Sequence, residues 1–156
     1  MKLQLIAVGG RMPGWVDQGY QEYARRMPRE CQLMLREIPA RPRGKHAAIE
    51  PLLKREAEQI LAAIPRGHGV IALDVNGKAW NTEQLSRQLA DWMASGRDYS
   101  LLIGGAEGLH SDCLARADLR WSLSPLTFPH PLVRVIVAEQ LYRAWTLLRH
   151  HPYHRA

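Results

Sequence analysis

The segment that most constrains this chain is residues 101–109, an apolar run that breaks into three glycines. It reads Leu-Leu-Ile-Gly-Gly-Ala-Glu-Gly-Leu, and Ser111-Asp112 after it is a helix start signal. Glycine has no Cβ, so a strand that ends in such a loop exposes bare backbone at the carboxyl edge of a sheet. A second loop, 122–131, follows one short strand later. We predict that the two loops form a ligand pocket; for the glycines the alternative is a tight strand-to-helix turn.

The rest of the chain alternates between strand and helix patterns. Strands are predicted over residues 2–8, 32–38, 70–75, 99–103 and 119–123, the third of them stopping at the turn signal Asn76-Gly77. Helices are predicted over 15–27, 46–64, 82–94 (capped by Asn81 or Thr82), 111–117 and 131–149. This alternation predicts an α/β fold with a mostly parallel sheet flanked by helices. Residues 1–156 are expected to form one domain.

Several classes of protein are excluded by what the chain lacks. No apolar run approaches the roughly 20 residues that cross a bilayer, and the first strand has no cleavage site after it. Cys31 and Cys113 are isolated and have no metal-ligand spacing. We therefore expect a reduced cytoplasmic protein with no membrane segment and no metal.

Positive charge is concentrated in one part of the chain. Of a formal net charge of +6, residues 25–45 supply most, with seven basic side chains against two acidic ones. Such a region favours a polyanion such as RNA, and Arg41, Arg43 and Lys45 are the candidate phosphate ligands. A solvated, arginine-rich surface is the alternative.

The last predicted helix has more apolar surface than one sheet can cover. Its main stripe consists of Val133, Val137, Leu141, Ala144, Trp145 and Leu148, and Leu132 and Ile136 extend it onto a second face. This pattern predicts a homodimer contact, or else a helix sunk deep in the core of one chain. For Arg134 and Arg143, phosphate binding and structural ion pairing both remain open; Glu139 lies four residues before Arg143.

Five segments of the chain closely resemble the RlmH family. They are residues 2–9, the glycine segment 101–108, Trp-Ser-Leu-Ser-Pro-Leu-Thr-Phe-Pro-His-Pro-Leu-Val-Arg at 121–134, Glu-Gln-Leu-Tyr-Arg-Ala-Trp at 139–145, and His-Pro-Tyr-His-Arg at 151–155. This family contains SPOUT-class methyltransferases that act on large-subunit ribosomal RNA. The resemblance extends over the whole chain.

The resemblance implies a SPOUT-type α/β knot, with a trefoil knot in the C-terminal half, and a homodimer. It implies transfer of a methyl group from S-adenosyl-L-methionine to N3 of a pseudouridine in 23S ribosomal RNA. The implied cofactor contacts, mostly through the backbone, are Leu73, Gly104, Leu123, Ser124, Pro125, Leu126, Thr127 and Phe128. The residues themselves suit an apolar adenine slot, although core packing is the alternative for Leu73 and Leu123.

The expected chemistry requires a route for one proton. A methyl sulfonium is already activated, so the protein must align the acceptor nitrogen and let its proton leave. His130 and Glu107 are the nearest candidates in sequence, and Tyr153 is a third. We favour a structural role for His130, between two prolines, and Glu107 is equally a solvated residue or an arginine partner. No base is assigned.

The C-terminal segment combines cations with an aromatic ring. Arg155 and His154 are candidates for RNA contact, and Tyr153 can stack on an unpaired base. The segment would close over the site of its own chain or complete that of a partner subunit. A frayed terminus is the alternative.

Other functions remain as alternatives to this interpretation. They are methylation of another RNA such as tRNA, and a non-catalytic role in ribosome assembly. A dinucleotide-dependent oxidoreductase is disfavoured, because the first strand ends at Val8-Gly9-Gly10 without a complete G-x-G-x-x-G motif.

Overall fold

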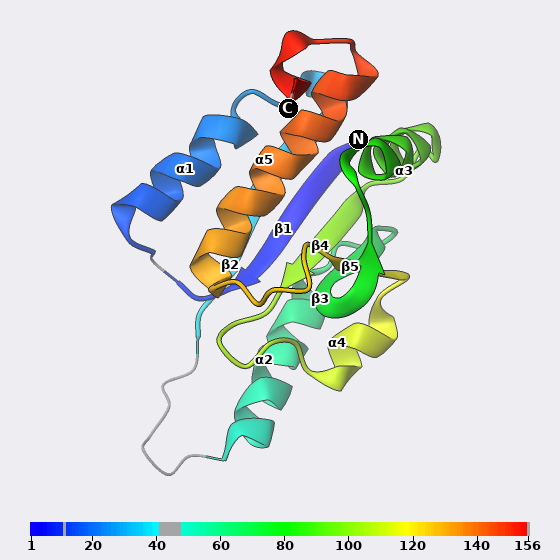
Figure 1. The fold of residues 1–156 in the computed structure, drawn as a ribbon. Coiled ribbons are helices and arrows are strands. Elements are labelled where there is room, and N and C mark those ends of the chain that lie inside the picture. Colours follow the sequence, from blue (N-terminus) through cyan, green and yellow to red (C-terminus); the bar gives the residue numbers. More distant parts are fainter. Residues whose placement is uncertain (11, 41–47, 156) are drawn as a thin grey trace.

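The computed structural model describes residues 1–10, 12–40 and 48–155. Its strands are β1 (Lys2–Val8), β2 (Gln32–Ile38), β3 (Gly69–Ala79), β4 (Tyr99–Ile103) and β5 (Leu119–Ser122). They form one parallel five-stranded sheet in the order β2-β1-β4-β3-β5 (Figure 1). The predicted α/β class with a parallel sheet is therefore confirmed, whereas the trefoil knot stays a prediction.

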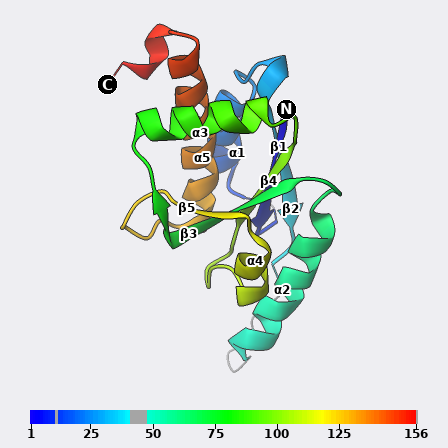
Figure 2. The same cartoon turned by 90° about the vertical axis from the view of Figure 1, so that its right-hand side faces the viewer.

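Helices cover both faces of this sheet. They are α1 (Gly14–Ala24), α2 (Ile49–Ala63), α3 (Thr82–Ala94), α4 (Ser111–Arg116) and α5 (His130–Leu148), with short 3-10 helices at Arg29–Cys31 and Pro152–His154. α1, α3 and α5 lie on one face, and α2 and α4 lie on the other (Figure 2). Within the described residues, no helix is long and apolar enough to cross a membrane.

Successive residues of the central strands serve the two covered faces in turn. Leu3, Leu5 and Ala7 of β1 belong to the core beneath α1, α3 and α5, while Ile6 and Val8 belong to the core beneath α2 and α4. Side chains alternate across a strand, so a strand buried on both faces has a continuous apolar sequence. This explains why the first and fourth strands are so apolar.

The predicted elements are confirmed closely in the core and less well at their ends. Strands 2–8, 32–38 and 99–103 and helix 82–94 have the predicted bounds. Asn81 is the cap of α3: its side chain accepts from the Gln84 N–H, and the Gln84 side chain accepts from the Asn81 N–H. The helix predicted over 15–27 ends at Ala24, although Met27 remains buried.

The prediction that the third strand stops at Asn76-Gly77 is wrong. β3 pairs with β5 up to Leu73↔Trp121, bulges over residues 74–77, and pairs again from Lys78↔Trp121. A Cβ on Gly77 would lie 2.7 Å from the backbone carbon of Arg120. Glycine is needed at this position because two backbones approach closely there, and not because the chain reverses its direction.

The helix predicted over 111–117 begins at Ser111 as expected and ends one residue early, at Arg116. The N-cap of α4 is His110, whose ring accepts a hydrogen bond from the Asp112 N–H. An imidazole nitrogen can replace the usual hydroxyl or carboxylate cap, because all of these groups present a lone pair to the free N–H groups of the first turn.

Candidate active site

A cavity of about 650 Å³ opens at the carboxyl edge of the sheet. It is lined by the start of the β3 bulge, the loop after β4, Leu114 of α4, the loop after β5 and the first turn of α5. Seven of the eight residues predicted to bind a cofactor line it, namely Leu73, Gly104, Leu123, Ser124, Leu126, Thr127 and Phe128. Pro125 lies within the same loop without lining the cavity. The two loops thus converge, and the identity of the ligand stays a prediction.

The glycine loop, residues 104–109, is a tight turn folded onto itself. A Cβ on Gly104 would lie 2.4 Å from the backbone carbon and oxygen of Gly108, which itself has a φ of +77°. The Gly108 N–H donates to the Gly105 carbonyl at 3.0 Å. Two of the glycines are therefore required by the backbone path itself. Gly104 has its Cα at the cavity wall, where a ligand can approach the main chain.

The second loop, residues 123–129, is held by hydroxyl groups. Ser122 Oγ donates to the Ser124 carbonyl at 3.1 Å, and Ser124 Oγ accepts from the Leu126 N–H at 3.0 Å. Below it, Trp121 is buried and packs against Trp80, with ring centroids 5.7 Å apart. Leu126, by contrast, is 69% exposed at the cavity. The loop is thus anchored by the buried Trp121 at its start, and the side chain of Leu126 stays exposed to solvent in the single chain.

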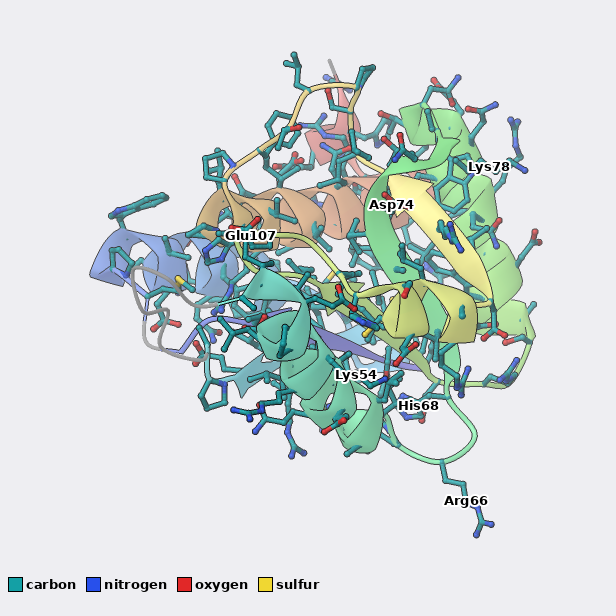
Figure 3. The ribbon with its side chains drawn as sticks, turned by 90° about the horizontal axis from the view of Figure 1, so that it is seen from below. Lys54, Arg66, His68, Asp74, Lys78 and Glu107 are labelled. Atoms are coloured by element: carbon teal, nitrogen blue, oxygen red, sulfur yellow. The ribbon has the colours of Figure 1, made fainter. Side chains whose placement is uncertain are left out.

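Asp74 is a cavity residue that the sequence reasoning missed. It lies in the β3 bulge, where its carboxylate accepts from the Asn76 N–H at 3.2 Å. Reading Asn76-Gly77 as a strand end hid the fact that the bulge turns residues 74 and 75 toward the cavity. Asp74 and Glu107 come from β3 and from the glycine loop respectively (Figure 3). Among the described lining residues, Asp74 and His130 are the titratable ones.

The three catalytic candidates lie in different places. His130 lines the cavity as the first residue of α5. Glu107 is exposed on the glycine loop beside the cavity and is not one of its lining residues. Tyr153 lies elsewhere: its hydroxyl donates to Glu139 at 3.0 Å, and its ring contacts the rings of Tyr23 and Tyr142. Partial burial, followed by its hydrogen bond to Glu139, raises the pKa of Tyr153, so the phenol keeps its proton.

The C-terminal segment and the cavity lie at opposite edges of the sheet. Arg149 pairs with Glu30 at 3.6 Å, and the ammonium group of Met1 donates to the carbonyl of the same Glu30. The two termini are therefore neighbours at the amino end of β1, whereas the cavity is at the carboxyl end (Figure 1). His154 and Arg155 belong to this segment. It does not close over the cavity of its own chain.

Of the two predicted RNA-binding arginines in α5, Arg134 has a structural position. It is 2% exposed, and its guanidinium donates to the Gly9 carbonyl at 2.7 Å and to Glu37 at 3.0 Å. These bonds connect the ends of β1 and β2 to α5. Arg143 pairs with Glu139 at 2.6 Å and its guanidinium lies over the Tyr153 ring. The geometry favours ion pairing for both, while Arg41, Arg43 and Lys45 lie outside the described residues.

Both cysteines are structural. Burial is the main cause that raises the pKa of Cys31 to about 12 and that of Cys113 to about 11. Neither thiol ionises near neutral pH, so neither provides a thiolate nucleophile.

Comparisons with known proteins agree with this arrangement. Residues 1–154 match the profile of a family described as "Predicted SPOUT methyltransferase". The chain belongs to this family. It is 61% identical over 155 residues to "Ribosomal RNA large subunit methyltransferase H" of Thioalkalivibrio sulfidiphilus and 58% identical to the protein of that name from Hahella chejuensis, with 99% of each chain covered. The family expected from the quoted segments is confirmed.

Solved structures show the same fold at low sequence identity. TrmJ of Z. mobilis is 15% identical with a TM-score of 0.54, and the match covers 92% of this chain and 70% of that one. A putative methyltransferase from Legionella pneumophila, solved in complex with bound SAM, is 10% identical with a TM-score of 0.52, covering 93% of this chain and 66% of that one. These likenesses support the fold alone.

The buried position of Arg134 predicts a large effect on stability. We expect Arg134→Met to lower the free energy of unfolding by about 3 kcal/mol, because Glu37 and the carbonyls of Val8 and Gly9 lose their donor. Urea denaturation measures this change. The matched control is Arg25→Met, which removes an exposed pair with Glu22 and should change stability by less than about 1 kcal/mol. Equal effects of the two substitutions would contradict the structural role of Arg134.

Proposed function

We propose that this chain transfers the methyl group of S-adenosyl-L-methionine to large-subunit ribosomal RNA. The observation that carries the proposal is the convergence of the two loops on one cavity in a member of the SPOUT methyltransferase family. Its relatives from Thioalkalivibrio and Hahella, matched over their full length, support ribosomal RNA as the acceptor. N3 of a pseudouridine in 23S ribosomal RNA, implied by the RlmH resemblance, is the proposed target atom.

The cavity fits the proposed cofactor by shape and chemistry. Leu73, Leu123 and Phe128 offer apolar walls to an adenine ring, and the backbone of residues 123–128 offers hydrogen-bonding groups to its edge. Gly104 lines the cavity, and its missing Cβ leaves room for the Gly108 backbone that closes the glycine loop. When bound, the sulfonium supplies an electrophilic methyl group, so the protein does not need a covalent nucleophile. The task of the chain is to fix two reactants in line and to accept one proton.

Two side chains stand where a proton could be taken up. His130 and Asp74 line the same cavity from different elements, one on the first turn of α5 and the other in the β3 bulge. Either can accept the proton of N3 directly or through a water molecule. The geometry adds Asp74 to the candidates that the sequence offered and leaves the choice between the two open to mutation.

We also propose a homodimer in which the C-terminal segment of one subunit completes the cavity of the other. In its own chain the segment lies at the opposite edge of the sheet from the cavity. Only a segment from a second copy can therefore reach the cavity. The second apolar face of α5 supports this: Leu132 and Ile136 remain partly exposed, whereas Val137 and Leu141 are buried. Leu126 at the cavity would then be covered by the partner or by RNA.

Labelled cofactor tests the function directly. The protein is incubated with it and, in parallel, with large ribosomal subunits, whole ribosomes and tRNA, and the modified nucleotide is mapped by mass spectrometry. Label in large-subunit RNA at a pseudouridine is expected. Label in tRNA alone would favour the other RNA substrate, and saturable cofactor binding without any transfer would favour a non-catalytic assembly factor.

Gly104→Ala should weaken cofactor binding. The new Cβ would meet the Gly108 backbone at 2.4 Å, so the loop must move, and we expect the dissociation constant to rise about tenfold or more. Isothermal titration calorimetry measures it. Gly10→Ala is the matched control, because a Cβ there meets nothing within 4 Å. Unchanged affinity in the Gly104 variant would place the cofactor elsewhere.

Removal of residues 150–156 should abolish methylation while cofactor affinity stays near that of the full chain. Cofactor affinity should persist because the lining residues of the cavity all lie between Leu73 and Val133, outside the removed segment. Mixing the truncated protein with the Gly104→Ala variant should restore activity, because a mixed dimer combines one intact cavity with one intact C-terminal segment. A truncated protein that is fully active alone would rule this arrangement out.

A further inference from the structure

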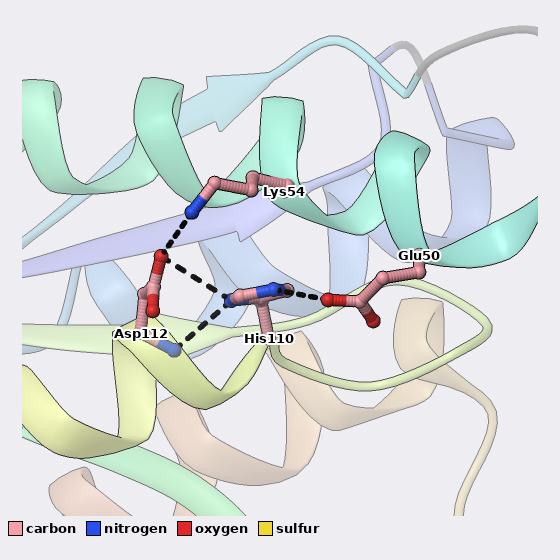
Figure 4. A network of polar contacts seen from close by, with 4 residues as sticks. All are labelled: Glu50, Lys54, His110 and Asp112. Carbon is pink, nitrogen blue, oxygen red and sulfur yellow. Dashed lines mark hydrogen bonds and ion pairs between the residues drawn. The ribbon is translucent and has the colours of Figure 1, made fainter.

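His110 is held on two sides in a polar network between α2 and α4 (Figure 4). Its Nδ1 accepts from the Asp112 N–H at 3.0 Å, so Nε2 carries the ring hydrogen and donates to Glu50 at 2.7 Å. Asp112 pairs in turn with Lys54 at 3.0 Å. The imidazole is buried, whereas the Glu50 side chain is 75% exposed. One ring thus caps α4 and also fastens that cap to α2.

The place of His110 in the chain gives this network its consequence. The residue directly follows Leu109, the last member of the glycine loop and a lining residue of the cavity. The other end of the loop begins at Ile103, which is fixed in the sheet. Between these two anchors the loop has one ladder contact of its own, between Gly105 and Gly108. The end at His110 is therefore fixed by side chains, and the end at Ile103 by the sheet.

The partners of His110 come from a single helix face. Glu50 and Lys54 are four residues apart on α2, so they lie one above the other on the side that meets α4. The two contacts, Glu50 with His110 and Lys54 with Asp112, fix the start of α4 against α2 at two points. Leu114, the α4 residue that lines the cavity, follows within the same short helix.

We propose that His110 is a positioning residue for cofactor binding, which holds the glycine loop in the conformation that accepts the ligand. This inference rests on the function proposed above. His110 does not touch the cavity; it acts through the loop. A loop that is held in its binding conformation loses less conformational entropy when the ligand arrives, and this is why its anchor affects affinity.

The cap and the connection to Glu50 can be separated by substitution. His110→Ala removes both. His110→Asn restores an N-cap acceptor but is too short to keep the bond to Glu50, and Glu50→Ala removes the same bond from the other side. Glu50→Gln keeps an oxygen that can accept from Nε2. The proposal therefore predicts that these substitutions weaken cofactor binding by different amounts, with the largest effect for His110→Ala.

The measured quantities are the dissociation constant of S-adenosyl-L-methionine, the KM for each substrate, and kcat at saturating cofactor. For His110→Ala we expect the dissociation constant and the KM of the cofactor to rise about tenfold, with kcat and the KM for RNA within about twofold of the original values. His110→Asn and Glu50→Ala should show equal, smaller increases, and the double substitution should add nothing further. Glu50→Gln should behave like the unsubstituted protein.

His68→Gln is the matched control. His68 is also largely buried and shares a hydrogen bond with Ser100 at 3.0 Å, and its ring lies 3.9 Å from the Asp98 carboxylate. It lies, however, at the amino end of β3 and β4. The His68→Gln substitution should leave the KM for the cofactor unchanged. If His110 had only a general structural role, its variants would lower kcat with the folded fraction and leave the KM of the cofactor unchanged, as His68→Gln would.

Hydrogen exchange of the amides at 104–109 without cofactor separates this proposal from the function it rests on. His110→Ala should speed exchange in this loop, and His68→Gln should not. If the unsubstituted protein bound no cofactor, the proposed function would fail and the proposed role in cofactor binding would fail with it, whatever the exchange rates. If that protein bound cofactor and His110→Ala bound it equally well, the positioning role alone would be wrong.

Discussion

Parallel alignment of the five strands is the constraint on which this structure depends. When all strands run the same way, the turns that leave their carboxyl ends gather at one edge, and the amino ends gather at the other. The glycine loop after β4, the loop after β5 and the β3 bulge therefore meet although they are separated along the chain. The same alignment places both chain termini at the other edge, because α5 returns along the sheet. Cavity and C-terminal segment are separated by the architecture itself.

The junction of β1, β2 and α5 shows how the fold maintains that edge. The Arg134 guanidinium bonds to the backbone after β1 and to the carboxylate near the end of β2, one helical turn beyond His130. A buried charge requires such partners, and they are costly to remove once the site has formed around them. The Arg134 side chain thus stabilises the fold and also fixes the start of α5 beside the cavity. The sequence shows only an arginine that follows the predicted cofactor loop by a few residues.

The sequence predicted features that depend on local patterns, and it failed where tertiary contacts override them. Apolar runs and the Asn81 cap depend on neighbours a few residues away, and the first, second and fourth strands and α3 were predicted to the residue. Asn76-Gly77 reads as a turn because nothing local reveals that the Arg120 backbone leaves no room for a Cβ at position 77. The burial of Arg134 and the place of Tyr153 depend on packing between α5 and distant elements. The two cavity loops are predictable because loops after parallel strands converge, the individual cofactor residues come from the resemblance to the RlmH family, and Asp74 is hidden by the missed bulge.

The separation of the C-terminal segment from the cavity also affects how the activity depends on protein concentration. If a working centre needs parts from two chains, its abundance follows the square of the monomer concentration under dilute conditions, while the cavity for the small ligand exists in every copy. Turnover per molecule would then decline on dilution before occupancy of the cavity does. Assembly would thus act as a threshold on modification, without any dedicated regulator.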